Sequence, residues 1–128
     1  MTPEEMRLSE TLPAARTKLE QLATATRFPE LKGSIDALRE ALDHLLSNKT
    51  GTEETAVDLA TQSVTQLYRT SMSQANAVPQ KYQQPVFQCY TDYEKCLAKQ
   101  ATVSGKALCV TLFVLSLADN LLSISIKV

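Results

Sequence analysis

The chain has 128 residues, of which 44% are hydrophobic and 21% charged, and its 13 basic and 14 acidic residues give a net charge of −1. This composition predicts one globular domain over residues 1–128 and excludes both wholesale disorder and a global attraction to nucleic acid. One histidine, no tryptophan and 3 glycines exclude a multi-histidine metal centre, a tryptophan ligand cage and a glycine-rich phosphate loop.

The first segment predicts a helix over about residues 2–26. Thr2 is a suitable N-cap residue and Pro3 fits the first helical position. Glu5 can complete a capping box with Thr2. Apolar residues then recur at alternating spacings of four and three, which is the pattern of one helix face. They are Leu8, Leu12, Ala15, Leu19, Leu22 and Thr26. Pro13 interrupts this series, so we expect either a kink there or a new start capped by Thr11.

The second and third segments also predict helices. The second begins at the boundary before Pro29 and ends in the polar run 47–51. Its apolar face consists of Phe28, Leu31, Ile35, Leu38, Leu42 and Leu45. The third, capped by Thr50 or Thr52, keeps a helical period up to Pro79.

The fourth segment combines a predicted loop with a predicted helix. Residues 79–85 are bracketed by prolines and indicate a loop, and the helix is expected over 86–97. Four of the seven aromatic residues gather here, namely Tyr82, Phe87, Tyr90 and Tyr93. Tyrosines suit both core edges and interfaces because they join a large apolar ring to a polar tip.

The last segment is the most apolar part of the chain. Ser104 and Gly105 form a weak break before it, and Asp119 is the only charge in residues 107–126. Twenty such residues are long enough to span a membrane, but placing Asp119 in lipid would cost a few kcal/mol. The pattern therefore favours a buried or oligomer-forming helix, with membrane insertion as the alternative.

Two faces of this segment are apolar, and we assign one to the core and the other to a partner. Leu108, Leu112, Leu115 and Leu122 form the predicted core face. Val110, Phe113, Val114, Leu117 and Leu121 form a second face, which we expect one small bundle to leave partly uncovered. The candidate interface residues are therefore Tyr90, Tyr93, Val110, Phe113, Leu117 and Leu121.

The three cysteines and the single histidine are interpreted as structural. Cys89 and Cys96 lie about 10.5 Å apart along a helix, too far for a mutual disulfide. Cys96 and Cys109 would meet only if the chain doubled back at Gly105. All three are expected to be core thiols, with a bridge between chains or to a partner as the alternative. Their spacing matches no zinc or redox motif, and His44 is expected on the surface.

Together these patterns predict an all-α fold, an antiparallel bundle of four to five helices with a very apolar C-terminal helix. We expect a small non-enzymatic protein that associates with itself or with a protein partner, without catalytic residues, cofactor or metal. Lysines 81, 95, 99 and 106 form too short a basic stripe for a nucleic-acid partner. The alternative is a membrane-associated helical subunit anchored by residues 107–126. An acidic start without a signal-peptide pattern predicts a cytoplasmic location.

Overall fold

The computed structural model describes residues 3–26, 29–47, 54–73 and 78–126. Within these ranges 94% of the residues are helical and none is in a strand, which confirms the all-α prediction. Five helices pack against one another. They are α1 (Pro3–Ala25), α2 (Pro29–Ser47), α3 (Glu54–Ser73), α4 (Gln80–Ala98) and α5 (Val103–Ile126).

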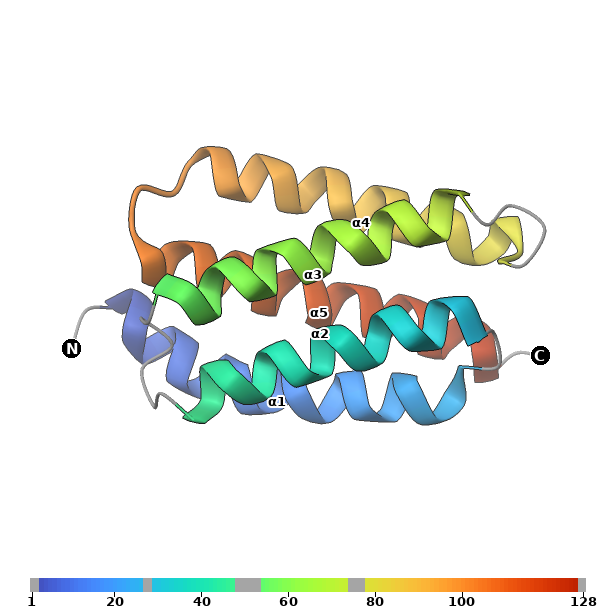
Figure 1. Ribbon diagram of the computed structural model, residues 1–128, viewed down its shortest axis with the longest axis horizontal. Helices are drawn as coiled ribbons and strands as arrows, with labels where there is room; N and C mark the ends of the chain where they lie inside the picture. The colour runs from blue at the N-terminus through green and yellow to red at the C-terminus, as the bar shows by residue number, and fades with distance from the viewer. Residues whose placement is uncertain (1–2, 27–28, 48–53, 74–77, 127–128) are drawn as a thin grey trace.

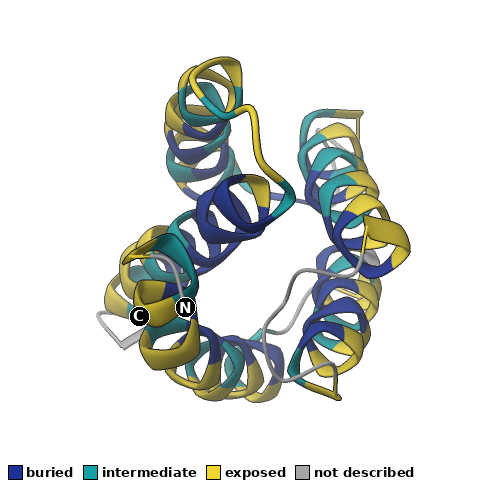
Figure 2. Cartoon of the chain, turned by 90° about the vertical axis from the view of Figure 1, so that its left-hand side faces the viewer, coloured by how far each residue is buried: buried dark blue, intermediate teal, exposed yellow. Residues whose placement is uncertain are grey.

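The five helices run along the long axis of the bundle (Figure 1). The apolar helix α5 contacts α1, α3 and α4, whereas α2 contacts α1 and α3. Viewed from the end, α5 has neighbours on several sides and α4 stands at the edge of the bundle (Figure 2). An all-round apolar helix is thus covered by three others, and α4 keeps one side open to solvent.

The α1 and α2 faces predicted from spacing form one half of the core. Every leucine and isoleucine of these two series that the structure describes is at most 3% exposed. Full burial of each such side chain contributes roughly 1.5–3 kcal/mol. Phe28, predicted in the same series, lies outside the described residues, as do the cap candidates Thr50 and Thr52.

Helix α1 passes through Pro13 without a new start, so the Thr11 cap is not used. The Thr11 hydroxyl instead donates to the Arg7 carbonyl at 2.9 Å, inside the helix. In Figure 1 the first turns of α1 are inclined to the rest, which fits the kink expected where a proline lacks its N–H.

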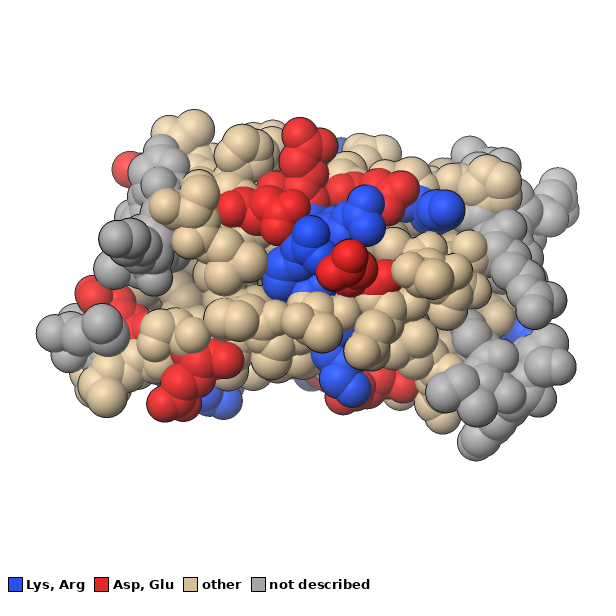
Figure 3. Space-filling model, turned by 90° about the horizontal axis from the view of Figure 1, so that it is seen from below, with Lys and Arg blue, Asp and Glu red and all other residues tan. Residues whose placement is uncertain are grey.

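Ion pairs join the polar sides of α1 and α2. Arg16 donates to Asp43 of α2 at 2.7 Å and to Glu20 of its own helix at 2.6 Å. Acidic and basic side chains alternate on the surface seen from below (Figure 3). Exposed pairs of this kind stabilise by less than about 1 kcal/mol each, so they orient the two helices more than they hold them.

The predicted loop over 79–85 is wrong, because α4 already begins at Gln80. Pro85 lies inside the helix and removes one backbone hydrogen bond, the one to the carbonyl of Lys81, an exposed residue. Burial offsets that loss, since Tyr82 and Val86 reach the core at 9% and 0% exposure. A proline at each end of a segment therefore does not by itself indicate a loop, because Pro79 precedes α4 and Pro85 lies within it.

The turn between α4 and α5 lies at residues 99–102, before the predicted break at Ser104 and Gly105. The Thr102 hydroxyl oxygen accepts a hydrogen bond from the Gly105 N–H at 3.0 Å, which caps α5. The hydroxyls of Thr102 and Ser104 donate to the Glu4 carboxylate at 2.8 and 3.2 Å. This carboxylate fixes the start of α1 against the positive end of α5.

Candidate functional site

The predicted partner face of α5 lies inside the protein's own core. Val110, Phe113, Leu117 and Leu121 are all between 0% and 3% exposed. The expectation that this face stays uncovered is therefore wrong, because α1, α3 and α4 together enclose it. Most of the face that we assigned to the core, Leu112, Leu115 and Leu122, is half-buried instead.

The two candidate tyrosines of α4 also point inward. Tyr93 is 3% exposed, and its ring lies 5.5 Å from that of Phe113. Tyr90 is half-buried and stacks on Tyr68 of α3 at 4.1 Å between ring centres. The Tyr90 hydroxyl lies 3.2 Å from the hydroxyl of Thr65. These rings hold α4 against α3 and α5, which leaves little of them for a partner.

Cys96 and Cys109 form a disulfide with their Cα atoms 5.8 Å apart, so the prediction of three free core thiols is wrong. The chain doubles back at residues 99–102, which brings α4 and α5 side by side at this point. Cys89 is the free cysteine and is buried, as predicted. Burial raises the pKa of its thiol, so it is a poor nucleophile.

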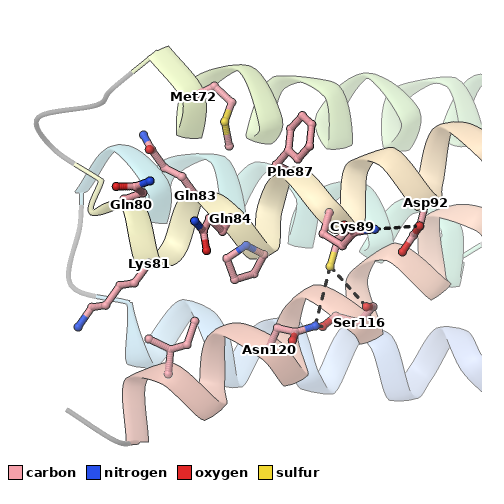
Figure 4. Close-up of a pocket in the computed structure, with 13 residues that line it drawn as sticks. Met72, Gln80, Lys81, Gln83, Gln84, Phe87, Cys89, Asp92, Ser116 and Asn120 are labelled. Atoms are coloured by element: carbon pink, nitrogen blue, oxygen red, sulfur yellow. Dashed lines mark hydrogen bonds between the residues drawn. The ribbon is translucent and has the colours of Figure 1, made fainter.

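A groove of about 980 Å³ runs from the end of α3 across α4 to α5 (Figure 4). Its apolar lining comes from Met72, Pro85, Phe87 and Ile124. Its polar lining comes mainly from uncharged amides, namely Gln80, Gln83, Gln84, Gln88 and Asn120. Amide side chains both donate and accept hydrogen bonds, as the backbone of another polypeptide requires.

Local contacts fix the shape of this groove. The Gln83 side chain donates to the Ser71 carbonyl at 2.9 Å and so joins α4 to the last turn of α3. On the α5 side the Cys89 sulfur lies 3.4 Å from the Ser116 hydroxyl (Figure 4). The Asn120 amide donates to the Ser116 carbonyl at 2.8 Å. The groove walls are therefore held by bonds between and within helices.

Phe87 is the exposed aromatic residue of this groove, with 54% of its surface accessible. The prediction placed it in the aromatic cluster but left it out of the interface. The buried residues of α4 are Tyr82, Val86, Cys89 and Tyr93, at spacings of four, three and four. Phe87 lies one position after Val86 and so about 100° away from that face. The same periodicity, applied to α4, would have found it.

The groove holds little that could carry out covalent chemistry. Its free thiol has a raised pKa, and Asp92 is its acidic residue. Among the described residues no three histidine, cysteine or acidic side chains are placed to hold a metal ion. His44 is exposed on α2 and is not among the residues that line this groove.

Comparisons of the chain with protein families, with curated proteins and with solved structures found no match. What the groove can bind is therefore inferred from the residues that line it.

Proposed function

We propose that this protein is a non-enzymatic association module, and that its docking surface is the exposed side of α4 with the adjoining groove. The observation that carries the proposal is Phe87, a residue that is 54% exposed and lines the same groove as the apolar residues Met72, Pro85 and Ile124. Burying an aromatic ring against a partner is among the strongest contributions to protein interfaces.

The surroundings of Phe87 support a polypeptide partner. Its groove offers amides to pair with backbone groups, and an interface core flanked by uncharged polar residues has this composition. Because α4 stands at the edge of the bundle, a partner reaches this side without displacing another helix.

The proposal is tested with a photo-cross-linking phenylalanine at position 87 in the full chain, produced in cells. The matched control carries the same group at Met6, which is also 54% exposed but lies on α1. We expect one discrete adduct from position 87 and none from position 6. No adduct from position 87, or the same adducts from both positions, would contradict an association surface on α4.

A second candidate is membrane association through α5. Its stretch Val103–Ile124 has 22 residues and is apolar enough to cross a membrane, although 56% of its most apolar part is buried inside the bundle. Insertion requires α5 to leave α1, α3 and α4, which exposes their apolar faces to water. Flotation with vesicles of phosphatidylcholine and phosphatidylglycerol separates the candidates: a membrane subunit rises with the vesicles, and a soluble association module stays behind.

A further inference from the structure

We infer that the partner on this surface is a second copy of the chain, docked antiparallel along α4 about a two-fold axis. The inference rests on the proposed function and adds the identity and register of the partner. Its basis is the placement of two charges of opposite sign on α4, Lys81 and Asp92, which are both exposed; Glu94 and Lys95 are exposed further along the same helix.

Lys81 and Asp92 occupy the same angular position on α4. Eleven residues separate them, which is about three turns, a rise of roughly 16.5 Å and an offset of only about 20°. Neither forms an ion pair with another described residue. The Lys81 Nζ atom lies 5.5 Å from the centre of the Tyr82 ring. The Asp92 carboxylate accepts a hydrogen bond from the Gln88 amide at 3.3 Å. Both charges are therefore accessible to a partner.

The midpoint between these two charges falls between Val86 and Phe87. A two-fold axis through this point, perpendicular to α4, sets a second α4 antiparallel to the first. Lys81 of each copy then meets Asp92 of the other, so that two ion pairs form at equal distances from the axis. Phe87 lies at nearly the same height as the axis but about 120–140° around α4 from the two charges, so it meets its own counterpart on the opposite flank of the contact.

The neighbouring side chains agree with the same axis. Gln84 and Gln88 are placed almost symmetrically about it, so the Gln84 amide of one copy faces the Gln88 amide of the other. A two-fold interface must be complementary to itself, and opposite charges placed equally far from the axis satisfy this requirement. Parallel packing would instead bring like charges together, at a cost in association.

Charge reversal tests the register. In the Lys81→Asp variant both positions are acidic, and in the Asp92→Lys variant both are basic, so each homodimer replaces two attractions by two repulsions. We expect each variant alone to associate about tenfold or more weakly than the wild type in sedimentation velocity over a concentration series. An equimolar mixture of the two variants should restore association, because attraction returns at both pairs.

The matched controls are Lys106→Asp and Asp58→Lys, which reverse exposed charges on α5 and α3. They should associate as the wild type does, alone and mixed, and circular dichroism should confirm that all four variants are helical. A wild-type chain that stays monomeric, reversals without effect, or a mixture no tighter than its components would overturn the inference. An adduct at position 87 with a different protein would contradict a second copy of the chain as the partner but would support an association surface on α4.

Discussion

The hydroxyl of Tyr93 lies in the core without a hydrogen-bond partner among the described residues. Burial raises the pKa of Tyr93, with smaller contributions from Tyr90 and Glu94. An unpaired hydroxyl costs free energy in an apolar site, whereas the ring that carries it packs against Phe113. The ring therefore stabilises the fold and the hydroxyl does not.

Tyr93→Phe should consequently leave the free energy of unfolding unchanged or raise it by about 1 kcal/mol at neutral pH, measured by urea denaturation. Because the folded pKa is raised, the stability linked to this group is present below the unfolded value of about 10 and is lost as the pH rises above it. The variant should therefore lose less stability than the wild type above pH 10. A variant clearly less stable at neutral pH would show that the hydroxyl has a partner.

The oxidation state of the three cysteines can be measured by counting the thiols that react with a thiol reagent. Native protein should react slowly with a thiol reagent, since Cys89 is buried and the burial raises the pKa of its thiol. Denatured protein should show one thiol without reductant and three after reduction, as one disulfide and one free cysteine require. Rapid reaction of Cys89 in the native protein would contradict its burial and would indicate a reactive thiol. Cys89→Ser should cost about 1–3 kcal/mol, because it buries a hydroxyl that has only the Ser116 hydroxyl, 3.4 Å from the present sulfur, as a nearby partner.

Among the elements, α5 shows where periodicity stops being informative. Both of its faces are apolar, so the sequence pattern could not decide which one turns inward. Contacts with α1 and α3, which are far away in sequence, and with the preceding helix α4 make that choice. On α4 the buried residues recur at spacings of four, three and four, so one face turns inward, and Tyr93, a predicted interface residue, lies on it.

A pair of phenylalanines tests this assignment of faces. Phe113→Ala should lower the free energy of unfolding by about 3–5 kcal/mol, because it leaves a cavity in the core. Phe87→Ala should cost less than about 1 kcal/mol in the single chain, since its ring is already exposed. Thermal unfolding of both variants gives the comparison, and equal losses would mean that Phe87 is also part of the core.

The disulfide between α4 and α5 closes a loop of 13 residues in sequence separation. By the loop-entropy argument, it should stabilise the protein by about 2–3 kcal/mol. The double variant Cys96→Ser, Cys109→Ser should therefore unfold at lower urea concentration than the oxidised wild type and close to the reduced wild type. Identical unfolding midpoints of the wild type with and without reductant would contradict a stabilising disulfide between Cys96 and Cys109. Disulfides persist mainly in oxidising compartments, whereas the start of the sequence predicts a cytoplasmic location.

For the whole molecule, local patterns were sufficient to predict an all-α bundle of four to five helices and the buried faces of α1 and α2. They did not predict the start of α4, because tertiary burial of Tyr82 and Val86 outweighs the cost of Pro85. They also did not place the exposed Phe87 among the interface candidates, because these followed the large apolar area of α5. An interface is defined by what the rest of the chain leaves uncovered, and that depends on the packing of all five helices.

The central claim is that another polypeptide covers the α4 surface around Phe87. Hydroxyl-radical footprinting measures this most directly, on the protein inside cells and on the purified chain at high dilution. Phe87 and Met6 are equally exposed in the single chain, at 54%. We predict that oxidation of Phe87 falls severalfold in cells relative to the dilute chain while oxidation of Met6 is unchanged. Equal oxidation of Phe87 in both samples would contradict the account.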